Sequence, residues 1–122
     1  MAHEIIVDQN KGIIRLKHSN CVKCESLLEA RQCLAETLKK VGADRILLDM
    51  READLNMASW EKSEFSDGHK RVFGTAYKIA VLIKNEPKQY KDYQDFETLY
   101  QSRGIDLRVF DNEFMAEEWL QK

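Results

Sequence analysis

The amino-acid sequence predicts an α/β domain with a mixed, mostly parallel sheet of five strands, an N-terminal hairpin and about four helices. Short apolar runs alternate with longer segments of helical periodicity, which favours right-handed crossovers between parallel strands. Two β-rich runs, residues 3–8 and 12–17, flank the turn before Gly12 and predict an antiparallel hairpin at the sheet edge. The 122 residues, 43% of them hydrophobic, suit one domain over residues 1–122.

The elements are expected in the order ββαβαβαβα. Apolar residues at three- and four-residue intervals predict a first helix over residues 22–41, and a glycine follows it, as it follows the next two helices. The run DRILLDM, residues 44–50, predicts a strand that is buried on both faces. The remaining elements are a helix at 58–73, a strand at 77–84, a helix at 88–103, a strand at 105–110 and a helix at 112–120.

Composition and charge exclude several classes of function. The net charge of −2 comes from 19 basic and 21 acidic residues interspersed along the chain, so no basic surface is expected to bind nucleic acid. No apolar run approaches the roughly 20 residues that cross a bilayer, and the beginning MAHEIIVDQN lacks the pattern of a secretory signal. The sequence therefore predicts a cytoplasmic protein without membrane insertion.

The stretch HSNCVKC, residues 18–24, raises the question of a metal or redox site. Cys33 lies about 13 Å further along the expected helix, so only His18, Cys21 and Cys24 can share an ion, whereas a closed zinc site needs four ligands. A C-x-x-C pair at a helix start can lower a thiol pKa, but the only proline, Pro87, lies in a charged turn and not opposite the pair as in thioredoxin-like proteins. We therefore favour free thiols, with Cys21 in the first helical turn.

Sequence signatures of catalysis are missing. The chain contains no dinucleotide-binding, P-loop, nucleophile-elbow or H-E-x-x-H motif. The segment ILLDMREAD resembles the phosphoacceptor strand of receiver domains, but the acidic pair after the first strand and the lysine after the last strand have no counterparts. We therefore predict a protein that is not an enzyme and needs no cofactor.

Polar side chains are expected to gather where the parallel strands end. Ligands of open α/β sheets bind beyond the carboxyl ends of the strands. The candidates for one polar pocket at this edge are Asp49, Arg51, Lys84 and Asn85. The alternative is that Asp49 caps local backbone and the other three side chains are solvated loop residues.

Three segments carry a family resemblance. They are LLDMREA at the end of the central strand, KIAVLI in the next strand, and RGIDLRVFDNEFMAEEWL, in which a glycine precedes a strand that leads into a helix with a tryptophan. With the order of elements, they resemble the STAS superfamily, in particular small bacterial proteins that are similar to the sporulation anti-sigma-factor antagonist and are grouped as STAS/SEC14-like. The resemblance covers nearly the whole chain and implies a non-enzymatic regulatory domain that binds another protein.

The resemblance also implies where the partner binds. In these antagonists the loop after the central strand and the start of the next helix contact a kinase-like anti-sigma factor, and phosphorylation of a serine at the helix start ends binding. Here the sequence is LNMASW, with Ala58 or Ser59 at the serine position, no aspartate directly before it, and Trp60 in place of a small residue. Met57, Ser59 and Trp60 are therefore candidate contacts, while phosphorylation of Ser59 and formation of a homodimer stay open.

Two further alternatives stay open at this stage. Trp60 can either anchor a partner or fold onto the sheet as part of the core. The SEC14-like part of the resemblance implies a second function, a carrier for a lipid or nucleotide, which would need an enclosed cavity beneath the third helix. That helix carries the aromatic stripe Tyr90, Tyr93, Phe96 and Tyr100, most of which we expect to be core.

Replacing Cys21 and Cys24 together by serine is expected to leave the fold intact. The free energy of unfolding should change by no more than about 2 kcal/mol, because we expect neither a metal ion nor a disulfide to depend on these thiols. Chemical denaturation measures this change. Metal analysis gives the contrary outcome, since stoichiometric zinc in the wild type that the double variant lacks would show that the thiols hold an ion.

Overall fold

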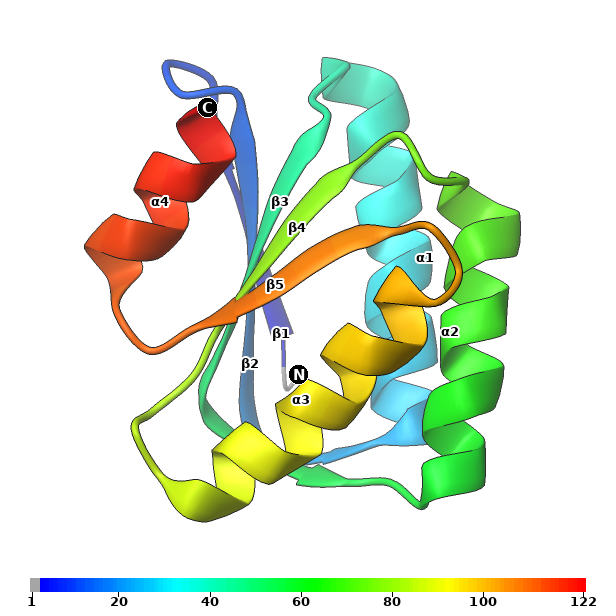
Figure 1. Cartoon of the computed structure of the whole chain (residues 1–122). Coiled ribbons are helices and arrows are strands. Elements are labelled where there is room, and N and C mark those ends of the chain that lie inside the picture. The colour runs from blue at the N-terminus through cyan, green and yellow to red at the C-terminus, as the bar shows by residue number, and fades with distance from the viewer. Residues whose placement is uncertain (1–2) are drawn as a thin grey trace.

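The computed structural model describes residues 3–122, apart from the side chain of Cys21, and shows a five-stranded sheet with helices on both faces (Figure 1). The elements are β1 (His3–Asp8), β2 (Ile13–Lys23), α1 (Cys24–Val41), β3 (Arg45–Asn56), α2 (Ser59–Phe73), β4 (Lys78–Leu82), α3 (Pro87–Gln101), β5 (Asp106–Phe110) and α4 (Glu113–Gln121). The strand order is β1-β2-β3-β4-β5. β1 is antiparallel to β2, and all other neighbours are parallel. The predicted fold class and order of elements are confirmed.

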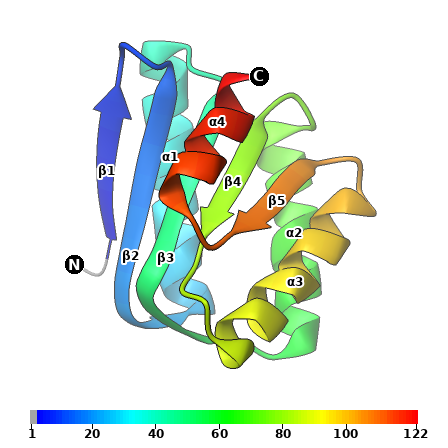
Figure 2. The same cartoon turned by 60° about the vertical axis from the view of Figure 1, so that its left-hand side comes forward.

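Helices cover the two faces of the sheet unequally. α1, α2 and α3 lie on one face, and α4 lies alone on the other (Figures 1 and 2). The middle strands are therefore buried on both sides: Ile46 and Val81 pack in the core beneath α1–α3, and Leu47 and Leu82 pack beneath α4. This two-sided burial explains the continuous apolar runs from which these strands were predicted.

The helices form where apolar periodicity and end signals agree. α1 buries the stripe Leu27, Ala30, Leu34 and Leu38, and it ends at Gly42, whose positive φ of 69° lets its N–H bond the Leu38 carbonyl oxygen. α4 begins after Asn112, whose side chain accepts a hydrogen bond from the Met115 N–H. None of the helices within residues 3–122 is both long and apolar enough to cross a membrane.

The strands β2 and β3 are longer than the sequence predicted. β2 runs to Lys23 and not to residue 17, and β3 runs to Asn56 and not to residue 50. The prediction that Cys21 lies in the first helical turn is therefore wrong, because this residue belongs to β2. The loop after the central strand also shrinks to Met57 and Ala58. The end of β3 alternates buried and exposed residues, so it contains no apolar run that would have revealed it.

A β-bulge interrupts the pairing of these two strands. Lys17 pairs with Asp49, but Ser19 pairs with Glu52, so β3 carries one more residue than β2 over this interval. Before the bulge, Leu47 faces α4. After it, Ala53 and Leu55 are buried in the core beneath α1–α3, although their even spacing from Leu47 would otherwise direct them toward α4.

Ion pairs help to hold α4 on its face of the sheet. Arg15 of β2 pairs with both Glu113 and Glu117, and Lys11 in the β1–β2 turn lies 3.2 Å from Glu117. Ala116 and Leu120 of α4 itself are fully buried in the core between this helix and the sheet. The apolar contacts supply most of the stabilisation, because partly exposed ion pairs contribute at most about 1 kcal/mol each.

Leu47→Asp is expected to unfold the domain. The side chain has no exposed surface, and a carboxylate between the sheet and α4 would have no partner, at a cost of roughly 4 kcal/mol or more. Leu28→Asp on the exposed face of α1 is the matched control and should change stability by less than about 1 kcal/mol. Circular dichroism and urea denaturation compare the two. A soluble Leu47→Asp variant with a cooperative transition near that of the wild type would contradict the assigned packing.

Candidate functional site

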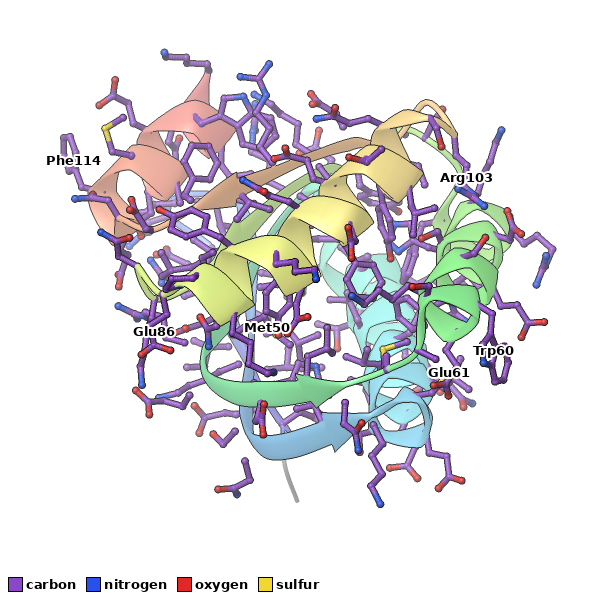
Figure 3. All side chains as sticks on the ribbon, turned by 60° about the horizontal axis from the view of Figure 1, so that its bottom comes forward. Met50, Trp60, Glu61, Glu86, Arg103 and Phe114 are labelled. Carbon is purple, nitrogen blue, oxygen red and sulfur yellow. The ribbon has the colours of Figure 1, made fainter. Side chains whose placement is uncertain are left out.

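The start of α2 presents a large aromatic side chain to solvent. Trp60 is 65% exposed and points outward at one end of the molecule, beside Glu61 (Figure 3). The alternative that Trp60 belongs to the core is therefore wrong. Met57, in the loop before the helix, is half-buried and packs against the core beneath α1–α3. An exposed tryptophan thus stands on a segment that Met57 anchors.

The first turn of α2 lacks the usual side-chain cap. The N-cap residue is Ala58, and its own N–H instead donates to Glu61 Oε1 at 2.9 Å. Ser59 is the first helical residue and is exposed. Its hydroxyl therefore lies on the surface, near the partial positive charge that the helix dipole places at an N-terminus.

A polar pocket of about 250 Å³ lies where β3 and β4 end and α3 begins. We call it the edge pocket; its charged lining residues are Arg51, Glu52, Asp54, Lys84, Glu86, Lys88 and Asp92. The structure thus brings together two of the residues predicted to share a pocket, Arg51 and Lys84. The other two, Asp49 and Asn85, are not among the residues that line it, although Asn85 is exposed in the adjoining loop.

The cations of the edge pocket lie close to carboxylates. Lys88 Nζ lies 3.1 Å from both Asp54 Oδ1 and Asp92 Oδ2, and these hydrogen bonds raise the pKa of Lys88. Lys84 Nζ lies 3.9 Å from Glu52 Oε2. A bare anion would have to compete with these carboxylates, so the mixed charges suit a polar protein surface better than a phosphate.

Asp49 has a structural role. Its carboxylate is buried and accepts hydrogen bonds from the backbone N–H of Arg51 at 3.2 Å and from Arg51 Nε and Nη2 at 3.0 and 2.9 Å. Arg51 Nη2 also lies 3.2 Å from Glu113 of α4. Burial raises the pKa of Asp49, but the Arg51 hydrogen bonds outweigh burial, and with the charge of Lys17 they hold this pKa below its ordinary value. Asp49 thus fixes Arg51 between the edge pocket and α4.

Gln89 is a site residue that the sequence analysis missed. Its Oε1 accepts a 2.7 Å hydrogen bond from the Lys84 N–H, and its Nε2 lies 3.3–3.5 Å from the carbonyl oxygens of Met50, Arg51 and Ala53. The side chain therefore bridges the bulge of β3 and the loop after β4. A signal was available, since Gln89 is the third residue of the helix that begins at Pro87, and glutamine at this position often bonds backbone N–H groups that precede a helix.

The thiols and the neighbouring histidine do not form a reactive centre in the part that the structure describes. Burial and the carboxylate of Glu61 raise the pKa of Cys24, which is opposite to the shift that a redox-active thiol needs. His18 is 1% exposed. Among the described side chains, no three His, Cys, Asp or Glu residues are grouped to hold a metal ion. The side chain of Cys21 lies outside this description.

A cavity of about 70 Å³ lies between the sheet and α1–α3. Three of the four aromatic residues of the predicted stripe on α3, namely Tyr93, Phe96 and Tyr100, are buried and line it. Tyr90 is half-buried outside this wall, and its hydroxyl donates to the Asp111 carboxylate. The stripe is therefore mainly core, as expected, but it encloses space.

Comparisons with known proteins identify the fold. An uncharacterised protein of the DUF3478 family with a SpoIIAA-like fold, from Shewanella loihica PV-4, superposes with a TM-score of 0.61 over 98% of this chain and 92% of its own, at 18% identity. The anti-sigma factor antagonist SpoIIAA in its unphosphorylated form superposes with the same TM-score of 0.61 over 98% of each chain, at 11% identity. No protein-family model and no curated protein matches the sequence. The chain has a STAS-like fold, as its resemblance implied.

Arg51→Met is expected to reverse the direction in which acid changes the folding stability through the ionisation of Asp49. In the wild type the depressed pKa stabilises the fold above the unfolded pKa, and this contribution is lost as pH falls through the folded pKa. Without Arg51, burial should raise the pKa of Asp49 above its ordinary value. Asp49 would then take up its proton more readily in the folded variant than in the unfolded chain, so acid should stabilise the folded variant. The stability gap between wild type and variant should therefore narrow by about 1 kcal/mol from pH 7 to 4.5.

Urea denaturation at both pH values measures this gap, and Arg103→Met is the control. Arg103 lowers the pKa of Asp67 through a hydrogen bond, but Asp67 is exposed, so without Arg103 this pKa should only return to its ordinary value. The control gap should hardly change over this pH range. A constant gap for Arg51→Met would show that burial of Asp49 has little effect on its ionisation.

Proposed function

We propose that this chain is a non-enzymatic regulatory module that acts in the bacterial cytoplasm by binding another protein through the start of α2. The observation that carries the proposal is the 65% exposure of Trp60 at that helix start. Tryptophan is among the residues most enriched at the centres of protein interfaces, because it buries a large, rigid surface on binding. Met57, in the loop before the helix, packs against the core and so anchors this segment.

The position of this surface supports the same proposal. SpoIIAA, which shares the fold, is an anti-sigma factor antagonist, and the resemblance implied partner contacts after the central strand and at the start of the next helix. The end of the molecule seen in Figure 3 presents the start of α2 together with the start of α3. We propose that Met57, Ser59 and Trp60 form the centre of the surface. Its polar rim comprises Arg51, Lys84 and Asn85, with Asp49 contributing by fixing Arg51.

The proposed partner is a kinase-like anti-sigma factor or another regulator. Ser59 is exposed in the first turn of α2, so a kinase could reach its hydroxyl. A phosphate there would be tolerated by the helix N-terminus but would place about two negative charges in the contact. Glu61 in the same turn would add to the repulsion. We propose that Ser59 phosphorylation, where it occurs, weakens binding.

A second candidate function is a small-ligand carrier of the SEC14-like kind. The observation that favours it is the apolar cavity beneath α3, which is partly open, whereas this alternative called for an enclosed one. Its walls are almost entirely apolar, and the charged residue among them is Arg31. Such walls suit a hydrophobic ligand far better than a nucleotide, whose phosphates need several cations or backbone donors.

Trp60→Ala is expected to weaken partner binding without unfolding the protein. Because Trp60 is exposed, the free energy of unfolding should fall by less than about 1 kcal/mol. The free energy of association with the partner should weaken by about 2 kcal/mol or more. Thermal melts measure the first effect. Quantitative pull-down from a lysate of the source cells identifies proteins that the wild type retains and the variant loses, and titration with the purified partner measures the second effect.

Phe114→Ala is the matched control, since Phe114 is 71% exposed on α4 and lies on the other side of the molecule from Trp60 (Figure 3). It should retain the partner. Ser59→Glu should fold normally, because an acidic residue suits a helix start, yet it should lose the partner. If all three variants retain the same proteins as the wild type, the start of α2 is not the binding surface.

A further inference from the structure

Three residues that line the internal cavity carry buried polar atoms without hydrogen-bond partners, and one of the three, Tyr93, also lines the edge pocket. The atoms are His18 Nδ1 from β2, His69 Nε2 from α2 and Tyr93 Oη from α3. All three residues line the cavity, and they are only 1%, 5% and 4% exposed. They therefore cannot reach bulk solvent, and they come from three separate elements that meet only in the folded chain.

Such a group needs an explanation, because burying an unpaired polar atom is costly. Buried side-chain nitrogen and oxygen atoms nearly always have a protein or ordered-water partner. The surrounding wall consists of residues such as Leu34, Ile46 and Phe96, which offer no hydrogen bond. Ordered water or a bound ligand can supply the missing hydrogen bonds.

The three groups are uncharged near neutral pH. Burial lowers the pKa of His18 to about 4, with a further contribution from His3, and lowers the pKa of His69 to about 3, with a further contribution from Arg31. Burial also raises the pKa of the Tyr93 hydroxyl, so this group stays protonated. A neutral imidazole and a phenol can each donate or accept a hydrogen bond, but none of them neutralises a charged ligand.

The charged residue of the wall is already engaged. Arg31 Nη1 donates a 3.0 Å hydrogen bond to the Phe65 carbonyl oxygen, and the guanidinium lies 4.5 Å from the centre of the Phe65 ring. It also lies against Gly68, where an added Cβ would come within 2.8 Å of both terminal nitrogens. The guanidinium is thus held at the contact between α1 and α2, where it pairs with α2 and is not directed at an anion.

We propose that this cavity binds a small uncharged amphiphile, a compact hydrocarbon or aromatic body with one hydroxyl or carbonyl group. The apolar wall would contact the body, and His18, His69 and Tyr93 would supply hydrogen bonds for the polar group. The volume of about 70 Å³ exceeds the roughly 10–15 Å³ that one water molecule needs. The inference rests on the carrier function proposed above and replaces its lipid or nucleotide with a smaller, neutral class of ligand.

The test uses phenol, toluene and benzoate as probes of similar size with the full-length protein at pH 7. Titration followed by two-dimensional NMR of the protein gives the three affinities, and the shifted resonances locate the probe. Phenol should bind about fivefold more tightly than toluene, which corresponds to one net hydrogen bond. Benzoate should bind at least tenfold more weakly than phenol, because its charge would be buried without a cation.

Tyr93→Phe separates the polar group from the apolar wall. It removes one hydroxyl and keeps the ring, so phenol should lose several-fold in affinity while toluene binds as before. The melting temperature should stay the same or rise, because the hydroxyl has no partner within the protein. Tyr77→Phe is the control, since Tyr77 is half-buried but does not line the cavity, and it should leave all three affinities unchanged.

Each other outcome overturns a defined part of the inference. Equal binding of phenol and toluene, unaffected by Tyr93→Phe, would refute the polar class of ligand and leave an apolar carrier. Benzoate binding as tightly as phenol would refute the neutral class. If saturating toluene and phenol shift no resonance of His18, His69 or Tyr93, the cavity holds water alone, and the carrier function fails together with the inference.

Discussion

The extra residue that β3 carries between Asp49 and Glu52 is the constraint on which the rest of the site depends. In a regular strand, alternate side chains keep to one face, so Leu47, Asp49, Ala53 and Leu55 would all point toward α4. The bulge sends the last two into the core beneath α1–α3 and leaves Asp49 beneath α4. Asp49 can then hold Arg51, which reaches Glu113 on α4. Gln89 meets the carbonyl oxygens around the bulge from the other side. The inserted residue thus places Asp49, Arg51 and Gln89, whose contacts link the edge pocket to α4.

The sequence predicted most clearly the elements whose buried residues form a regular pattern. β4 is an uninterrupted apolar run because both of its faces are covered, and α1 shows its buried stripe at regular intervals. The bulge was not predictable in the same way. The residues around it, Met50, Arg51 and Glu52, have no composition typical of a bulge. The feature is defined by pairing with Lys17 and Ser19 of β2, which lie more than 30 positions earlier in the chain. The end of β3 escaped prediction for another reason, since its alternating burial leaves no apolar run.

The candidate site was only partly predictable, because α2 does not bury apolar residues alone. Its buried positions include Lys62, Ser66 and His69, and its first turn exposes Trp60. Lys62 tolerates burial because its Nζ lies 3.3 Å from Asp95 Oδ2 and 5.8 Å from the centre of the Phe96 ring. These partners belong to α3, so a sequence pattern within α2 could not reveal them. The sequence therefore did not decide whether Trp60 lies in the core or on the surface. Lys62, two residues later, is buried against α3, so Trp60 lies on the opposite, exposed side of the helix.

The two candidate functions meet on α2. Trp60 stands at the exposed start of this helix, and His69, about two and a half turns later, lines the internal cavity. Between them Lys62 fastens the helix to α3, and Arg31 fastens it to α1. Trp60 and His69 therefore lie on one helix that is fastened to both of its neighbours between them. If a ligand in the cavity changed the affinity for a partner at Trp60, linkage would require the partner to change the ligand affinity by the same factor. The two proposed functions therefore do not compete for the same residues, since the cavity and the start of α2 use opposite ends of one helix.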